Sequence, residues 1–361
     1  MKSISIYRLN AIFLFVILTT IVLYYGKEFL VPLFFAILLA MLLLPVCNKL
    51  EKWGLGRVTS TFAGMFLIVA FVAGIVGIIA AQGASLSDDW PKMQEKVQQF
   101  SQQGKELLTT KYGITAKEQE SYVQKGKTKM EQSGGQFFQK FFSGMMGFLT
   151  AFVLTLLYFF FLMWKREKYR EFFLKLVHEE NRKEVKKELD QISDVAGMYL
   201  IGRLISMVFL AVFYMVGFSI VGLENGLLIA LVAVLPTIVP YVGAFIGGFF
   251  PIAMAFVGGS TDMILPIAGI LIVAQIIDNN IIEPLVEGES LDISPIWTIV
   301  SIVLGELVWG IPGMILFMPM FAILKIICDH IPTLHPFSFL LENEMDEPKW
   351  LGKVKGLFGK S

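Results

Sequence analysis

The sequence has few of the residues on which enzyme and metal sites depend. It contains only 2 cysteines, Cys47 and Cys328, and 3 histidines, His178, His330 and His335. So few cysteines argue against a disulfide framework as the basis of the fold, and the histidines all lie outside the long apolar runs. No HExxH, GxSxG, phosphate-binding P-loop or CxxC pattern occurs in the chain. We therefore expect no enzyme, no catalytic residues, no metal or cofactor, and no pump driven by ATP.

An excess of charge is also missing. The 30 Lys and Arg residues balance the 30 Asp and Glu residues, so the formal net charge is +0. A chain without a basic excess has no general electrostatic attraction for nucleic acid, and we expect none as a partner. The positions of individual charges are informative instead.

What the sequence has in abundance is apolar residues, which make up 55% of the chain, with a mean hydropathy of +0.68. Soluble domains are about 45–50% apolar. The excess is gathered in runs of about 20 residues, the length of helix that crosses roughly 30 Å of hydrocarbon. The composition predicts an all-α polytopic membrane protein of about six to eight spans in a lipid bilayer. The runs are Leu9–Tyr25, Phe29–Val46, Val58–Ala81, Phe141–Trp164, Met198–Val221, Leu227–Val257, Met263–Ile282 and Ile296–Ile327.

Lysine and arginine in the short loops predict the orientation, because basic loops stay in the cytoplasm. The loop around residues 48–57 and the stretch 165–190 are basic, whereas the loop 222–225 contains no basic residue. These assignments alternate without conflict along the chain. They predict a multi-pass protein whose N- and C-termini are both cytoplasmic.

The same pattern divides the chain into seven segments with different roles. The segment 84–138 is polar, and its apolar residues recur at helical spacing, which fits packing inside an extracytoplasmic cap or contact between subunits. The predicted segments are scaffold spans one to three (1–83), the helical cap (84–138), the fourth span (139–164), cytoplasmic amphipathic helices (165–196), transport unit one (197–258), transport unit two (259–328) and a cytoplasmic tail (329–361).

Two apolar runs are interrupted by glycine and proline at matching places. Each follows one clean span, so the order of a span and then a broken run occurs twice. The interrupting residues are Pro236, Pro240 and Gly243 in "LPTIVPYVG" and Gly310, Pro312 and Gly313 in "WGIPG". We interpret each broken run as a re-entrant helical hairpin in an inverted repeat, the sequence pattern that indicates a transporter's binding site. A single kinked crossing also fits the charge pattern.

A polar face lies at the end of the run 263–282. Gln275, Asp278, Asn279 and Glu283 are spaced at i, i+3, i+4 and i+8, which places them on one side of a helix. Polar groups within a span are costly and usually face a cavity or a partner. These oxygens suit a small cation, a proton relay or a hydroxylated solute. The alternative is a helix end that enters the membrane interface before Pro284.

Two isolated charges also occur within apolar runs. Glu306 precedes the second break, where it can accept hydrogen bonds from freed backbone donors, titrate during transport or coordinate a cation. Arg203 lies near the cytoplasmic end of the fifth span. It can extend to the interface or pair with one of the acidic groups.

Three segments together resemble the autoinducer-2 exporter family of bacterial transporters. They are "LVPLFFAILLAMLLLPVCNKLEKWGLGR", "LPTIVPYVGAFIGG" and the stretch from "IIDNNIIEP" to "MPMFAILK". The resemblance covers nearly the whole chain and implies a secondary transporter of the bacterial inner membrane. Some members are associated with export of autoinducer-2, and others with exchange of sodium or lithium for protons. The family pattern maps onto Pro240, Tyr241 and Gly243, onto Asp278, Asn279, Asn280, Glu283 and Pro284, and onto Gly310, Pro312 and Gly313.

The sequence thus predicts a secondary transporter with its site between the two broken hairpins, where Tyr241 covers the solute. It exports a small polar solute of the autoinducer-2 type or exchanges monovalent cations for protons, with Na⁺ or H⁺ as the coupling ion. We expect a homo-oligomer, because the scaffold helices are apolar all round. The alternative is a non-transporting receptor or assembly protein that acts through the extracytoplasmic cap.

Overall fold

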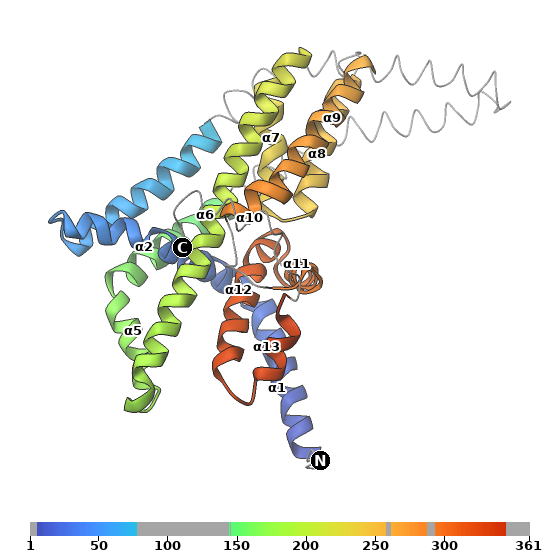
Figure 1. Ribbon diagram of the computed structural model, residues 1–361. Helices are drawn as coiled ribbons and strands as arrows, with labels where there is room; N and C mark the ends of the chain where they lie inside the picture. The colour runs from blue at the N-terminus through green and yellow to red at the C-terminus, as the bar shows by residue number, and fades with distance from the viewer. Residues whose placement is uncertain (1–5, 78–143, 145, 258–260, 287–292, 344–361) are drawn as a thin grey trace.

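The structure is a computed structural model, and it describes residues 6–77, 144, 146–257, 261–286 and 293–343 (Figure 1). Within these ranges the chain is helical apart from turns and one isolated antiparallel bridge between Ile293 and Glu342. The predicted cap (84–138) lies outside the described residues, as does most of the predicted tail.

The helices follow the apolar runs closely. Their bounds are α1 (Ile6–Tyr25), α2 (Lys27–Lys52), two helices over Arg57–Gly77 and Met146–Trp164, α5 (Arg166–Lys175), the short 3₁₀ helix η1 (Glu179–Asn181), α6 (Arg182–Val221), α7 (Gly226–Val234), the 3₁₀ helix η2 (Leu235–Ile238), α8 (Val242–Val257), α9 (Thr261–Ile277), the π-helix η3 (Asp278–Ile282), α10 (Glu283–Val286), α11 (Pro295–Trp309), α12 (Ile311–His330) and α13 (His335–Leu341).

Six helical segments in the described part of the chain are long and apolar enough to cross a membrane. The prediction of an all-α polytopic membrane protein is therefore confirmed. The six segments are Lys27–Lys52, Arg57–Gly77, Met146–Trp164, Glu179–Val221, Asp262–Val286 and Ile311–His330.

Helix α6 is longer than the sequence predicted. Its 40 residues form one helix, about 60 Å long at 1.5 Å per residue and so about twice the thickness of the hydrocarbon layer. The expected division between an amphipathic helix ending at residue 196 and a span beginning at 197 is therefore not a break in the backbone. Gly197 lies inside the helix, where a Cβ would come 3.5 Å from the carbonyl oxygen of Met41. This distance is an ordinary van der Waals contact, so Gly197 lies where α6 packs on α2 and does not mark a turn.

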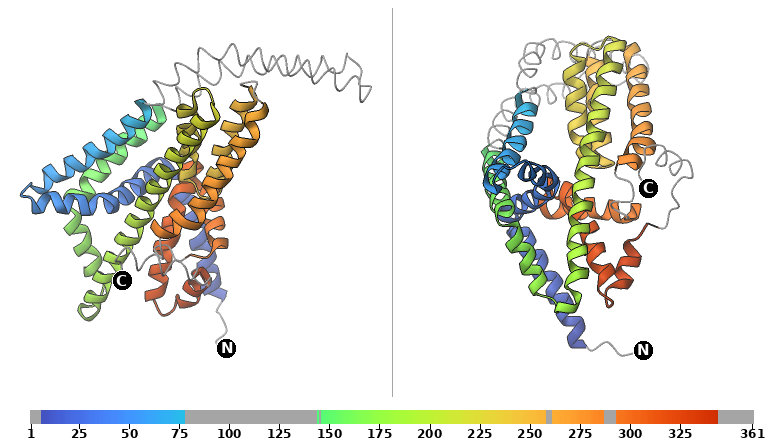
Figure 2. Two further views of the ribbon diagram at one scale, coloured as in Figure 1. Left: turned by 45° about the horizontal axis from the view of Figure 1, so that its top comes forward. Right: turned by 60° about the vertical axis from the view of Figure 1, so that its left-hand side comes forward.

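The first broken run is a helical hairpin in which α7 and α8 pack against each other. A Cβ on Gly247 would lie 2.0 Å from the carbonyl oxygen of Ala233, and one on Gly243 would lie 1.9 Å from that of Pro236. Only glycine permits this approach of the two backbones. The hairpin packs on α6 and α9, and the four helices lie side by side in Figures 1 and 2 around a core that includes Ile229 and Ile267.

The second broken run is also a hairpin, and its turn is at Gly310, whose φ is +67°. Pro312 lies in the first turn of α12, where proline is tolerated because its missing N–H needs no helical partner. A Cβ on Gly313 would lie 1.9 Å from the carbonyl oxygen of Gly305, so α11 and α12 are in backbone contact. The chain therefore reverses at both breaks, in agreement with the hairpin interpretation.

A second group of helices flanks this assembly. Helix α2 and the helices Arg57–Gly77 and Met146–Trp164 share a core that contains Ala36, Ile68 and Phe159. At one end of this group, Arg166 Nη2 lies 2.6 Å from Glu51 Oε2, and Ser60 donates to Glu51 Oε1 at 2.9 Å.

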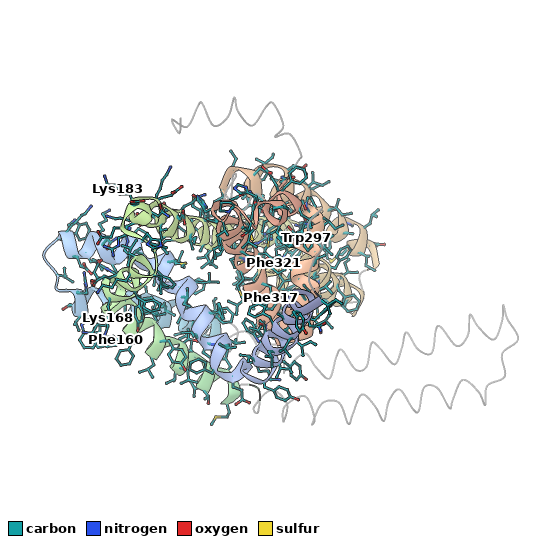
Figure 3. All side chains as sticks on the ribbon, turned by 90° about the horizontal axis from the view of Figure 1, so that it is seen from below. Phe160, Lys168, Lys183, Trp297, Phe317 and Phe321 are labelled. Carbon is teal, nitrogen blue, oxygen red and sulfur yellow. The ribbon has the colours of Figure 1, made fainter. Side chains whose placement is uncertain are left out.

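In Figure 1, α5 extends downward from the turn at the end of α2. The view from below in Figure 3 shows Lys168 of α5 and Lys183 of α6 on this side.

Candidate functional site

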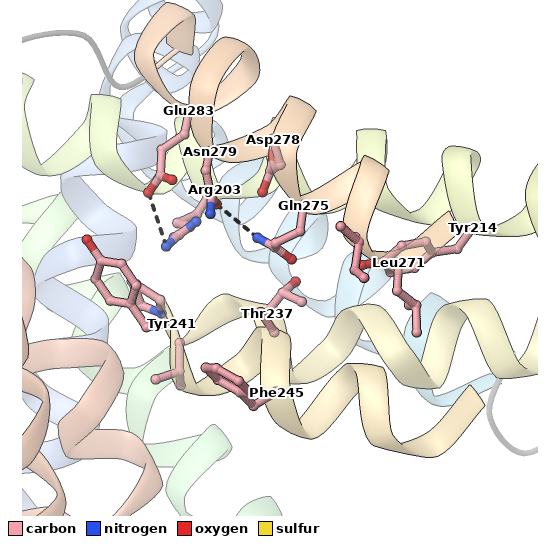
Figure 4. A pocket seen from close by; sticks show the side chains of 14 residues that line it. Arg203, Tyr214, Thr237, Tyr241, Phe245, Leu271, Gln275, Asp278, Asn279 and Glu283 are labelled. Carbon is pink, nitrogen blue, oxygen red and sulfur yellow. Dashed lines mark hydrogen bonds and ion pairs between the residues drawn. The ribbon is translucent and has the colours of Figure 1, made fainter. Parts of the chain in front are cut away.

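A cavity of about 330 Å³ lies between the first hairpin, α6 and the polar end of α9 (Figure 4). Its volume falls within the range of about 300–1,000 Å³ that is usual for small-molecule sites. All four residues of the predicted polar face line it, and so do Arg203 and Tyr241. The lining residues are Arg203, Tyr214, Thr237, Val239, Pro240, Tyr241, Ala244, Phe245, Leu271, Ile272, Gln275, Asp278, Asn279 and Glu283.

Asp278 is the most deeply buried charged residue of the cavity, with only 1% of its surface exposed. Ser206 Oγ lies 2.6 Å from Asp278 Oδ1 and 2.7 Å from Oδ2. A hydroxyl carries one hydrogen, so both contacts fit a shared donation to the ionised carboxylate. They equally fit a protonated carboxyl that donates to Ser206 Oγ through one oxygen. The pair can accept or release a proton without rearranging its heavy atoms.

Arg203 and Glu283 form an ion pair across the cavity. The guanidinium Nη2 lies 3.4 Å from Glu283 Oε1, and Arg203 is only 6% exposed. Of the two positions that the sequence allowed for Arg203, the structure therefore has the pairing rather than extension to the interface. Because only one oxygen takes part at this distance, the contact is looser than a bidentate arginine–carboxylate pair.

A π-helix carries the polar residues at the end of α9. It spans Asp278–Ile282 and inserts an extra residue into the helical turn between Asp278 and Glu283. Such segments are rare and occur frequently at functional sites. Gln275 Nε2 donates to Asn279 Oδ1 at 2.9 Å, one turn apart on the cavity side. Asn280 instead donates to the carbonyl oxygen of Ile276 at 2.8 Å and does not line the cavity.

The turn of the first hairpin supplies the opposite wall. Tyr241 has a φ of +59°, a left-handed conformation that is uncommon for residues with a side chain. It is held there by hydrogen bonds on either side, from Val242 N to Pro240 O at 2.6 Å and from Gly243 N to Val239 O at 2.9 Å. Figure 4 shows the ring of Tyr241 directed toward Arg203 and Glu283. Pro236 and Pro240 end the regular helix and allow the chain to turn here, which explains the presence of prolines within this apolar run.

The two ends of the cavity differ in polarity. In Figure 4, Arg203, Glu283 and Tyr241 lie at one end, whereas Tyr214 and Leu271 lie at the other. Val239, Ala244, Phe245 and Ile272 add further apolar lining. The cavity is thus amphipathic.

The second hairpin contributes nothing to this cavity. No residue of α11 or α12 lines it, so this cavity does not lie between the two hairpins, where the sequence analysis placed the site. The physical reason is that α11 and α12 pack on other helices, where Trp309, Leu316 and Phe317 share a core with Leu38 of α2 and Ala196 of α6.

Several predicted residues consequently lie away from the cavity. The side chain of Glu306 is exposed on α11. Gly310, Pro312 and Gly313 form the turn and the first residues of α12 in the same hairpin. They shape that hairpin, and none of them contacts the cavity.

Sequence reasoning missed Ser206, Thr237 and the apolar lining. Ser206 had a detectable signal, because it lies three residues after Arg203 and so on the same face of α6. Thr237 Oγ1 donates to the carbonyl oxygen of Val234 at 2.6 Å and helps to satisfy the interrupted helix. Phe245 and Leu271 carried no signal, since they are apolar residues within apolar helices.

Known proteins resemble this chain over most of its length. YueF of Bacillus subtilis (strain 168), provisionally named a transport protein, is 27% identical over 319 residues, covering 82% of this chain and 84% of YueF. PerM of Escherichia coli (strain K12), provisionally named a permease, is 26% identical over 316 residues, covering 84% and 88%. YrrI of Bacillus subtilis (strain 168), also provisionally named a transport protein, is 25% identical over 314 residues, covering 84% and 87%.

A family model agrees with these similarities and with the resemblance found in the sequence. The model described as "AI-2E family transporter" matches residues 13–333. This match takes in the first hairpin, the polar end of α9 and the second hairpin. The chain is a multi-pass membrane protein with a role in membrane transport, and it belongs to the AI-2E family of transporters.

Proposed function

We propose that this protein is a secondary transporter of the bacterial inner membrane whose substrate site is the cavity between α6, the first hairpin and the end of α9. It exports a small polar solute of the autoinducer-2 type or exchanges monovalent cations for protons. The loop at residues 222–225 faces outward, and α5 and both termini lie on the cytoplasmic side. Na⁺ or H⁺ is the coupling ion, and the protein acts as a homo-oligomer.

The observation that carries this proposal is the buried Asp278–Ser206 pair beside the Arg203–Glu283 ion pair. Carboxylates are expensive to bury within a membrane and mark ion pathways and proton relays when they line a cavity. The heavy-atom geometry of Asp278 and Ser206 fits both protonation states. Proton binding at Asp278 is therefore the step that couples transport to a gradient.

The hairpin provides a way to expose the cavity to each side in turn. Helices α6, α7, α8 and α9 share one core, and the turn around Tyr241 forms one wall of the cavity. A movement of this group relative to α2 and the second hairpin opens the cavity alternately, as an elevator or a rocking motion.

The test is transport by the purified full chain in proteoliposomes that contain a pH-sensitive dye. Gradients of sodium, lithium or potassium are imposed first, and autoinducer-2 is supplied next. Wild type is compared with Asp278→Asn and with Asp262→Asn. The second variant makes the same change at an exposed carboxylate at the start of α9, outside the cavity.

We expect proton movement coupled to one of these substrates in wild type and in Asp262→Asn, and its loss in Asp278→Asn. Equal coupled flux in all three proteins contradicts the assignment of Asp278. Absence of flux with all four contradicts the exchange of inorganic cations and the export of autoinducer-2.

A further inference from the structure

We propose that the cavity accepts a small amphipathic organic cation, which carries one positive charge on an apolar body, and that it exchanges this cation for a proton. This inference rests on the proposed transport function and names the substrate class of the same site. Three features of the cavity support it, namely its charge balance, its apolar lining and the state of its polar groups.

The charge balance calls for one additional positive charge. Arg203 contributes one positive charge to the lining, whereas Asp278 and Glu283 contribute two negative charges when both are ionised. Arg203 already pairs with Glu283 at 3.4 Å. The carboxyl of Asp278 is hydrogen-bonded to the Ser206 hydroxyl, a neutral donor, and the single charge of Arg203 cannot balance Asp278 and Glu283 together. A buried charge needs a counter-charge or a proton. Asp278 is therefore expected to hold a proton when no substrate is bound, and an ionised Asp278 favours a substrate that carries a positive charge.

The apolar lining shows that this cation has an organic body. Leu271, Ile272 and Phe245 line the cavity from α9 and α8, across from the ion pair. Burial of an apolar body against such side chains is favourable by roughly 25 cal/mol per Å² of surface. The exposed ring of Phe245 also offers a face to a cation, a common feature of sites for quaternary ammonium groups.

A bare metal ion fits the cavity less well. An ion that sheds its water needs several oxygen ligands at close range in place of the hydration shell. Here the two carboxyl groups already have partners, and one end of the 330 Å³ space is apolar. In the described part of the chain, no three His, Cys, Asp or Glu side chains are grouped so that they could hold a metal ion.

Exchange with a proton follows from the same arrangement. The titratable and charged groups that line the cavity with Asp278 are Arg203 and Tyr214 from α6, Glu283 from α10 and Tyr241 from the hairpin turn. The charges of Arg203 and Glu283 offset each other, so the protonation state of Asp278 decides whether the lining has a net negative charge that attracts a cation. The proton and the organic cation therefore compete.

The experiment measures binding by calorimetry to the full chain in lipid nanodiscs. The probes have the same ring and differ in charge: benzyltrimethylammonium (cation), benzyl alcohol (neutral) and benzoate (anion). Sodium chloride tests the bare ion. The proteins are wild type, Asp278→Asn, Phe245→Ala and the matched control Asp262→Asn.

We expect wild type and Asp262→Asn to bind benzyltrimethylammonium at least tenfold more tightly than benzyl alcohol or benzoate. Asp278→Asn should abolish this preference, and Phe245→Ala should weaken the cation about tenfold. In wild type the affinity for the cation should fall by about tenfold per pH unit once the proton occupies Asp278, with release of about one proton on binding. The wild-type pH series tests the proposal even if a variant does not fold.

Equal or tighter binding of benzyl alcohol, benzoate or sodium overturns the organic-cation inference and leaves the proposed transporter standing with another substrate. Binding of the cation that is independent of pH overturns the exchange with a proton. Failure of every probe to bind overturns the inference, and the proteoliposome experiment then decides separately whether the protein transports an inorganic cation or autoinducer-2.

Discussion

The two broken runs have the same design in the sequence but different surroundings in the structure. Each is a helix, a glycine–proline break and a second helix with an internal proline, and each folds into a hairpin whose backbones touch at glycine. The first hairpin faces Arg203, Asp278 and Glu283 across a cavity. The second packs Trp309 and Phe317 into an apolar core with α2 and α6.

This difference teaches that a helix break does not make a binding site by itself. The break removes backbone partners and lets the chain turn, and the same geometry serves both hairpins. The neighbour decides the outcome: polar groups at the end of α9 and in α6 leave a cavity, whereas aromatic rings fill the space. The two hairpins should therefore respond differently to substitution.

The largest expected effect comes from substituting the glycines at which the two helices of each hairpin touch. Gly313→Ala and Gly247→Ala each place a Cβ within 2.0 Å of a backbone oxygen across the hairpin. Backbone atoms cannot move aside, so each change should lower the free energy of unfolding by about 3 kcal/mol or more. Thermal unfolding in detergent measures it, with Gly248→Ala as the control, because its Cβ would meet no atom closer than 3.8 Å. Wild-type stability of Gly313→Ala contradicts the close contact of α11 and α12.

Two buried serines, Ser206 on α6 next to the first hairpin and Ser301 within the second hairpin, should respond differently to substitution by alanine. Ser206→Ala leaves the buried carboxyl of Asp278 without its donor and should cost about 1–3 kcal/mol, together with most of the proton-coupled transport. Ser301→Ala in α11 removes only a donation to the carbonyl oxygen of Thr298. Its cost should be under about 1 kcal/mol, with transport retained. Thermal unfolding and the proteoliposome assay measure both. A larger loss of transport in Ser301→Ala reverses the assignment of the two hairpins.

The third prediction concerns the second hairpin alone. Trp309 Nε1 donates to the carbonyl oxygen of Leu23 at 2.8 Å and so ties the end of α11 to α1. Trp309→Phe keeps an aromatic ring but loses this bond, and we expect a loss of about 1 kcal/mol in stability with little change in substrate affinity. Trp297→Phe, on the same helix, serves as the control in thermal unfolding. If Trp309→Phe weakens substrate binding tenfold, the second hairpin takes part in the site.

The smallest expected effect concerns the turn of the first hairpin. Tyr241 has a φ of +59°, and the left-handed conformation costs about 1–2 kcal/mol for a residue with a Cβ. Tyr241→Gly should relieve this strain and raise the free energy of unfolding by up to about 1 kcal/mol, while transport falls because the ring no longer covers the cavity. Tyr241→Asn tests the strain separately, because asparagine tolerates this conformation. A less stable Tyr241→Gly shows that contacts of the ring outweigh the strain.

Some features of the site were predictable because they depend on local chemistry. The spacing of Gln275, Asp278, Asn279 and Glu283 predicted a shared face, and all four line the cavity. The hairpins were predictable for the same reason, since proline and glycine act on the backbone near them. The continuity of α6 through Gly197 was not predictable, because α6 packs along α2, which is distant in the sequence.

The sequence by itself determined the class of the protein: apolar runs long enough to span a bilayer, two breaks that turn the chain, and one polar helix end. These features follow from hydrophobicity and from backbone geometry, which act over a few residues. Only the tertiary structure decided which break borders the site, that Arg203 pairs with Glu283, that Ser206 meets Asp278, and that Glu306 lies outside the cavity. The pairs Arg203–Glu283 and Ser206–Asp278 join residues that are 80 and 72 positions apart in the sequence. Such contacts depend on how whole helices pack.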